Sequence, residues 1–309
     1  VFELLAHYGC RDFRSIGHKA IFVANGFRTL QCIGWRYAEP VLRSLTYALL
    51  NHNGEPNPSQ SDLKPDASVK VADEVISQFG DNWNSGAIDH EASRQLLDVL
   101  RDATPEDAVR ETAKLVQSGI HPQSVFDALF LSAGEMLMQQ PGIVALHAST
   151  TSNAIAYAYR TAMKPETRLR LLLQNAAFIP YFRQSMASRG KVAGIKIADL
   201  IEASDSQAEP TVDVIFDDVG KKRKDASVST MRYLSDGGSP TDLIDTARKL
   251  VFLKGNDSHD YKFSSAVIED FYAVSPELRN LYLSAATYML PGSNDRDNGL
   301  IGRVRSAFA

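Results

Sequence analysis

Three histidines lie in similar local settings, and imidazole nitrogens are suitable ligands for divalent first-row transition metals. His18 lies in the apolar run GHKAIFVAN, His147 in LHASTTSN and His259 in SHDYKF. Each histidine is followed, roughly twenty residues later, by the pattern Pro-x-x-Arg, which opens another helical run. Three neutral imidazoles that converge from separate helices form a metal site when their nitrogens lie close together. We therefore predict that His18, His147 and His259 bind one metal ion.

Three further polar residues are candidates for the same site. Glu135 stands in the apolar segment AGEMLM, where an unpaired carboxylate is costly to bury. It is a candidate fourth ligand, and the alternative is a buried ion pair with a helical arginine. Asp260 and Lys262 lie within one helical turn of His259, and Asp260 is a candidate to orient that imidazole or to accept a proton.

The same residues allow two other interpretations. Each histidine can be a packed imidazole that bonds a neighbour, which would make the protein a helical scaffold or binding module. His259 and Asp260 also form a His-Asp dyad of the kind that metal-dependent phosphohydrolases use, with Asp295 downstream. The chain lacks Glu-x-x-His, HExxH, GxGxxG, GxxxxGK[ST] and GxSxG, so ferritin-like di-iron, dinucleotide, ATP and serine-hydrolase sites are not predicted.

The elements that position these residues are predicted to be helices almost throughout. Thr104-Pro105, Ser239-Pro240 and Ser275-Pro276 are a capping residue followed by a first-turn proline. Helices are expected over residues 1–9, 14–33, 39–50, 68–79, 88–102, 105–118, 122–140, 143–163, 165–189, 194–203, 226–235, 240–254, 259–273, 276–290 and 298–308.

Two polar excursions interrupt this pattern, at 51–66 and 204–226, and within the second only residues 211–216 (TVDVIF) alternate like a strand. The predicted fold class is therefore all-α. We expect residues 1–309 to form a single large domain, a multi-helix bundle of helical hairpins around a buried histidine-lined site.

Composition narrows the class of partner. The 309 residues are 44% hydrophobic and 23% charged with a net charge of −4, which is typical of a soluble globular protein and argues against nucleic-acid binding. No apolar run approaches the roughly 18 residues that a membrane span needs. Cys10 and Cys32 show no metal or disulfide spacing, which fits the cytoplasm. Because the chain begins at Val1, we expect further residues upstream of it, and a signal peptide is one alternative for them.

The histidine-containing strings also resemble a known family. The histidine before IFVANGFRTL (His18), the one in LHASTTSNA (His147) and the one in HDYK (His259) resemble those of the questin oxidase-like proteins, with Lys262 as a fourth correspondence. The strings GHKAIFVAN, AEPVLRSL and HDYKF are closer still to those of a group of uncharacterised bacterial proteins. The resemblance spans about residues 15 to 290 without the polar excursions, and HAST stands where HAVT is more usual.

The resemblance implies an α-helical oxidoreductase, a monooxygenase that inserts oxygen into a carbonyl-containing or aromatic small molecule. Together with the three histidines it favours a divalent metal, iron first, with haem or flavin as alternatives. Asp260 and Lys262 would then be catalytic residues. The partners it implies are a small-molecule substrate and an electron-donor protein, either of Rieske type or a flavoprotein.

Overall fold

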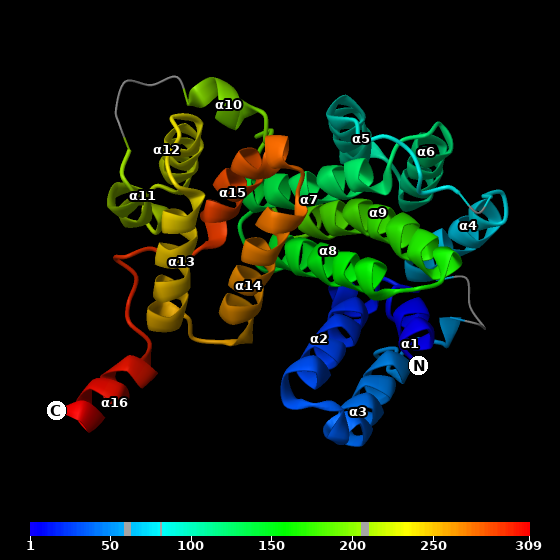
Figure 1. Ribbon diagram of the computed structural model, residues 1–309, viewed down its shortest axis with the longest axis horizontal. Coiled ribbons are helices and arrows are strands. Elements are labelled where there is room, and N and C mark those ends of the chain that lie inside the picture. Colours follow the sequence, from blue (N-terminus) through cyan, green and yellow to red (C-terminus); the bar gives the residue numbers. More distant parts are fainter. Residues whose placement is uncertain (59–62, 81, 205–209) are drawn as a thin grey trace. The chain divides into compact units, whose positions relative to one another are not determined.

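The computed structural model describes residues 1–58, 63–80, 82–204 and 210–309 of the chain. Within these ranges the regular elements are helices and none of the residues belongs to a β-strand (Figure 1). A single isolated bridge joins Ala87 and Ile120. The prediction of an all-α fold is confirmed. No helix in the described ranges is long and apolar enough to cross a membrane.

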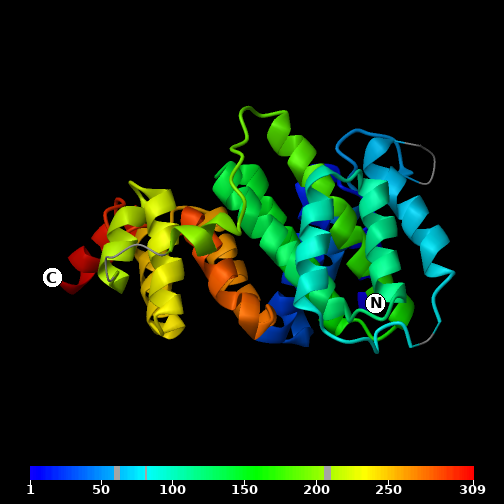
Figure 2. The ribbon, with the colours of Figure 1, turned by 90° about the horizontal axis from the view of Figure 1, so that it is seen from above.

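The first of two compact units consists of Val1–Ser132 and Thr150–Gly190. Its helices are α1 (Phe2–Gly9), α2 (His18–Ile33), α3 (Ala38–Leu50), α4 (Ala67–Ile76), α5 (His90–Asp102), α6 (Pro105–Gln117) and α9 (Pro165–Ala187), with 3-10 turns η1 (Arg14–Gly17), η2 (Trp35–Tyr37) and η4 (Lys64–Asp66). The long helix α9 packs against α1, α4, α5 and α6 (Figures 1 and 2). It is therefore the central helix of this unit.

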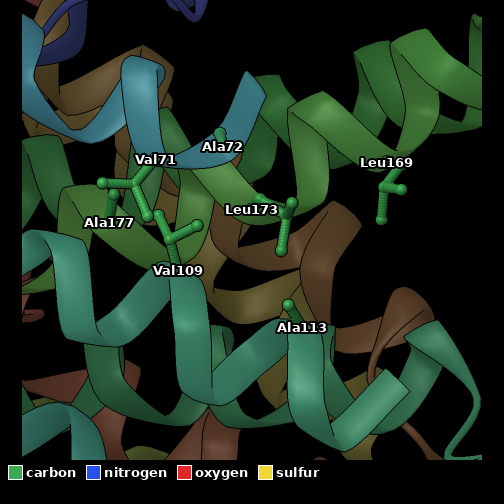
Figure 3. Packing of buried hydrophobic residues seen from close by; sticks show 7 residues of the cluster. All are labelled: Val71, Ala72, Val109, Ala113, Leu169, Leu173 and Ala177. Atoms are coloured by element: carbon green, nitrogen blue, oxygen red, sulfur yellow. The ribbon is translucent and has the colours of Figure 1, made fainter. Parts of the chain in front are cut away.

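A buried apolar cluster joins α4, α6 and α9 (Figure 3). Its members are small or branched aliphatic side chains: Val71, Ala72, Val109, Ala113, Leu169, Leu173 and Ala177. Thr104 begins α6 as predicted, because its hydroxyl accepts a hydrogen bond from the Asp107 backbone N–H at 3.1 Å and Pro105 follows it. The apolar stripe of each helix thus faces its neighbours, and burial of these side chains stabilises the unit.

The second unit consists of Ala133–Ser149 and Lys191–Ala309. Its helices are α10 (Asp199–Ala203), α11 (Val212–Val219), α12 (Arg223–Ser235), α13 (Pro240–Lys254), α14 (Ser258–Ala273), α15 (Arg279–Ala286) and α16 (Gly299–Phe308), with 3-10 turns η5 (Pro276–Leu278) and η6 (Thr287–Met289). Helix α15 packs against both α12 and α14, α11 packs against α12, and α13 packs against α14 (Figure 1).

Two long helices contribute residues to both units. These are α7 (Pro122–Gln139), which passes from the first unit into the second, and α8 (Ile143–Thr161), which passes back. Most residues of both helices are buried, and the buried part of α8 includes the polar run 149–153. That the chain forms one domain stays a prediction.

One predicted element is wrong. Residues 211–216 were expected to alternate like a strand, but they belong to α11. The Thr211 hydroxyl caps this helix by accepting from the Val214 backbone N–H, and Ile215, Phe216 and Val219 are buried at helical spacing. A six-residue alternation is too short to distinguish the two periods once a cap and a packing partner favour the helix.

Both polar excursions contain helical structure as well. The second is not irregular in its described part, since it contains α11 and the beginning of α12. The first contains the 3-10 turn η4. Residues 59–62 and 205–209, which fall within the two excursions, lie outside the described residues.

Candidate metal centre

The three predicted histidines form a group that can hold a metal ion. His18, His147 and His259 each offer one ring nitrogen, and these three atoms lie within 4.8 Å of one another. The rings of His147 and His259 meet edge to face with centroids 5.4 Å apart. His147 is 2% exposed, whereas the other two are half-buried. The three histidines therefore cluster, but only His147 is fully buried, and metal binding by the group stays a prediction.

The Nδ1 atom of each ring lies against an oxygen. In α8 the backbone carbonyl of Ile143, one turn earlier, lies 2.7 Å from Nδ1 of His147. The Ser15 carbonyl makes a short contact with Nδ1 of His18. Nδ1 of His259 lies 3.4 Å from Oδ1 of Asp257. A carbonyl or carboxylate oxygen only accepts, so each Nδ1 is the donor in its contact. In a neutral ring with its proton on Nδ1, Nε2 is the nitrogen that can bind a metal. Metal-binding histidines are oriented in this way.

The contact from Ser15 to His18 depends on an unusual turn. Ser15, Ile16 and Gly17 follow one another in the left-handed region, with φ of 54°, 49° and 81°. That conformation costs a non-glycine residue about 1 kcal/mol or more, and it is rare for a β-branched residue such as Ile16. Because the turn reverses the chain, the Ser15 carbonyl meets the first residue of α2, which is His18. Backbone strain of this kind concentrates at functional sites.

Gly17 also permits a close approach between α2 and α8. A β-carbon added at Gly17 would overlap the side chain of Thr151. Thr151 follows His147 by one turn in the same helix, so the contact brings the residue before His18 to within a turn of His147. The side chain of Thr151 is therefore packed against Gly17.

A buried ionic network supports the turn. Asp12, Arg14, Lys19 and Asp66 are each at most 4% exposed. The Arg14 guanidinium donates to both carboxylate oxygens of Asp66, and the Asp66 hydrogen bond raises the pKa of Arg14. Lys19 Nζ donates to Asp12 Oδ2 at 3.0 Å, and the Arg14 backbone N–H donates to Asp12 Oδ1 at 2.9 Å. The network thus holds both ends of the segment that presents His18.

Asp257 positions His259 from the beginning of α14. Its carboxylate accepts from the backbone N–H groups of His259 at 2.7 Å and Asp260 at 3.4 Å, which is an N-cap. Asp260 completes a capping box, because its Oδ2 accepts from the Asn256 and Asp257 backbone N–H groups. The hydrogen bond from the His259 N–H lowers the pKa of Asp257.

Asp260 was predicted to be the partner of the His259 imidazole, but the carboxylate beside Nδ1 of His259 belongs to Asp257. Asp260 directs its carboxylate to the backbone, so these contacts support a structural role for it. The sequence does contain the pattern of a capping box. In the string DSHD an aspartate stands two residues before His259, and a second acidic residue follows three positions after it.

The other two predicted site residues, Lys262 and Glu135, lie on α14 and α7. Lys262 is half-buried on α14, three residues after His259. Glu135 is fully buried on α7, and its Oε2 accepts from the Ile197 backbone N–H at 3.0 Å. Its Oε1 accepts from the Gln139 side-chain amide at 3.4 Å. These contacts explain how a buried carboxylate is satisfied, and its role as a fourth ligand stays a prediction.

Comparison with models of protein families finds no match, and neither curated proteins nor solved structures match the chain. The resemblance to questin oxidase-like proteins therefore stays an expectation from the histidine-containing strings. The chemical argument for this site comes from its own three imidazoles and their hydrogen-bonded Nδ1 atoms.

Proposed function

We propose that the protein is a metal-dependent oxidoreductase whose ion is bound by Nε2 of His18, His147 and His259. The observation that carries this proposal is the grouping of the three ring nitrogens within 4.8 Å of one another. Imidazoles that are held at Nδ1 and brought this close together are suited to bind an ion through Nε2.

The donor set fits a catalytic ion better than a structural one. Structural zinc sites close all four positions with protein ligands, commonly cysteines, whereas catalytic sites keep a position for water or substrate. The group found among the described residues contains three histidines, and Cys10, which is buried, and Cys32, which is exposed, are not in it. Three neutral ligands leave coordination positions for a small molecule.

Iron is the ion we propose, because the resemblance implies a monooxygenase of the questin oxidase-like type. Iron bound by imidazole supplies one-electron and oxygen chemistry when it is present. Within this proposal the three histidines hold the ion, and Asp257 and the carbonyls of Ser15 and Ile143 orient the imidazoles from the Nδ1 side. The substrate is a carbonyl-containing or aromatic small molecule, and a Rieske-type protein or flavoprotein supplies electrons.

The phosphohydrolase alternative receives less support. In that class the aspartate of the His-Asp dyad binds the metal, but the carboxylate of Asp260 is engaged by the Asn256 and Asp257 backbone N–H groups. Asp260 is also not a member of the group of potential ligands. The scaffold alternative, in which the three histidines are packed imidazoles, predicts that no metal is bound.

Metal analysis tests the proposal directly. The protein is purified without chelator and reconstituted anaerobically with Fe²⁺, Mn²⁺, Co²⁺ or Zn²⁺, and bound metal is measured after gel filtration. We expect close to one equivalent of metal per chain. The Co²⁺ form adds a spectroscopic test, since imidazole ligation changes the visible absorption of the ion.

Single substitutions assign the ligands. His18→Ala and His259→Ala should each lose most of the bound metal, while His90→Ala, a histidine outside the group, should keep it. Glu135→Gln should lower the free energy of unfolding, because the carboxylate accepts the Ile197 N–H, and the metal content of this variant tests the predicted fourth ligand. Wild-type protein with less than about a tenth of an equivalent of any of these metals would overturn the proposal.

A further inference from the structure

A cavity of about 360 Å³ lies in the first unit, beside α1, α3 and the segment that follows α3. Most of its wall is apolar and comes from leucines of α1 and α3: Leu4, Leu5, Leu42, Leu49 and Leu50. Leu4 and Leu50 are 61% and 69% exposed, although their neighbours Leu5 and Leu49 are buried. The cavity therefore presents apolar surface that a ligand would remove from water.

The cavity wall also contains two polar residues, Asp12 and His52. Lys19 Nζ lies 3.0 Å from Asp12 Oδ2 and 2.9 Å from His52 Nδ1. An ammonium group only donates, so Nδ1 of His52 accepts and its proton is on Nε2. Burial, and then the charge of Lys19, lower the pKa of His52, so the ring stays neutral at neutral pH. His52 thus offers one N–H donor, for which no acceptor is found among the described residues.

Arg11 adds a positive charge to the cavity wall. Its guanidinium forms no ion pair or side-chain hydrogen bond with the part of the chain that the structure describes. The negative charge of Asp12 is offset by Lys19 at 3.0 Å and by Arg14 at 3.7 Å. Arg14 is also paired with Asp66 and Glu55, so these buried cations are already engaged. Arg11 is the cavity-lining cationic side chain without an ionic partner among the described residues, and its N–H groups match a carboxylate.

We propose that this cavity binds a medium-chain monocarboxylate, with its carboxylate on Arg11 and His52 Nε2 and its chain against the leucines of α1 and α3. The volume fits a ligand of this size: at roughly 30 Å³ per water-sized group it holds about twelve heavy atoms. Decanoate has that many. The proposal does not depend on a metal ion, and protein with or without metal is expected to bind decanoate equally.

Calorimetric titration tests the charge requirement. Decanoate is compared with decylamine and decan-1-ol, which share its chain, all well below their micelle-forming concentrations. We expect decanoate to bind at one site, decanol to bind about tenfold to a hundredfold more weakly, and decylamine not to bind measurably. Equal binding of the three compounds would show unspecific adsorption of an apolar chain and would overturn the proposal, as would the absence of decanoate binding.

Two variants locate the site. Arg11→Met keeps the apolar stem and should weaken decanoate about tenfold or more while leaving decanol unchanged. Thr46→Trp places an indole at the wall of the cavity from an exposed position and should abolish binding of decanoate. Tyr47→Trp, at a neighbouring position that is 77% exposed and outside the cavity wall, is its control and should bind like wild type. If Thr46→Trp binds decanoate as Tyr47→Trp does, the ligand lies elsewhere and the proposal fails.

Discussion

At the scale of single residues, the orientation of the three imidazoles depends on the atoms behind them. Two of the three Nδ1 partners are backbone carbonyls, of Ser15 and Ile143, and no side-chain substitution removes them. The third is the carboxylate of Asp257, which is 65% exposed and acts on His259 through solvent-screened charge as well as through contact. Asp257 is therefore the residue at which the proposed ligand set can be tuned without removing a ligand.

Asp257→Asn should weaken metal binding about tenfold, which is the low end for a residue that orients a ligand, because the carboxylate is largely exposed. Asparagine also caps helices well, so α14 should stay intact. Competition with a chelating dye measures the affinity, and circular dichroism checks the helix content. Asp89→Asn makes the same change at the N-cap of α5 and should leave metal affinity unchanged. Equal affinity of wild type and Asp257→Asn would show that Asp257 only caps α14.

At the scale of elements, the turn η1 and the first residue of α2 act together. The left-handed run from Ser15 to Gly17 aims a carbonyl at His18, and Gly17 lets the helix approach Thr151. Asn53 donates from its side-chain amide to the Ser15 hydroxyl, which ties the turn to the segment after α3. The conformation of the turn is thus held from three sides.

Gly17→Ala should destabilise the protein by about 2–4 kcal/mol, from the left-handed backbone and from overlap with Thr151. It should also weaken metal binding, since His18 moves with the turn. Gly26→Ala is the matched control in the same helix: the nearest atom, Leu45 Cδ2, lies 3.4 Å from the added carbon, and alanine favours the helix by about 0.5–1 kcal/mol. Urea denaturation measures the free energy of unfolding of both variants. A stable Gly17→Ala protein with unchanged metal affinity would refute this account of the turn.

The buried ion pair between Arg14 and Asp66 makes a separate prediction. Asp66→Asn leaves the Arg14 guanidinium buried without its main carboxylate, and the expected loss is about 3–5 kcal/mol. Glu55, 46% exposed and 2.8 Å from Arg14 Nε, compensates only in part. Asp98→Asn removes an exposed partner of Arg101 and should change stability by less than about 1 kcal/mol. Similar losses for the two variants would contradict the importance of the network.

At the scale of the whole molecule, buried acidic groups that stay protonated make the free energy of unfolding depend on pH in the alkaline range. Burial raises the pKa of the Cys10 thiol to about 12, and it raises the pKa of the Tyr181 phenol to about 12 as well. Above the ordinary thiol value of 9.0 the unfolded chain loses the Cys10 proton while the folded chain keeps it. The folded state then binds more protons than the unfolded state, so the free energy of unfolding falls as pH rises.

The free energy of unfolding should therefore decline between about pH 9 and pH 12, by up to about 1.4 kcal/mol per pH unit for each such group. Cys10→Ala should make the decline shallower in urea titrations at several pH values, whereas Cys32→Ala, at an exposed thiol, should leave it unchanged. In the native protein a thiol reagent should label Cys32 alone, and both cysteines in denaturant. Rapid native labelling of Cys10 would contradict its burial.

The sequence by itself determined the helical character of the chain and the identity of the three histidines. Periodic apolar residues, first-turn prolines and capping residues such as Thr104 and Ser239 act within a few positions, so their effect is visible without the fold. Thr211 is also a capping residue, but the short alternation of 211–216 equally fits a strand. Only the packing of Ile215 and Phe216 shows that the segment forms α11.

The tertiary structure decided how the site is built. Glu135 is satisfied by a backbone N–H 62 residues away, and Gly17 meets Thr151 in another helix, neither of which local patterns can indicate. The partner of His259 was chosen between two nearby aspartates by the geometry of a capping box. The physical reason is that helix formation is largely a local property, whereas the partner of a polar atom is selected by which distant segments pack against it and which backbone dihedrals that packing imposes.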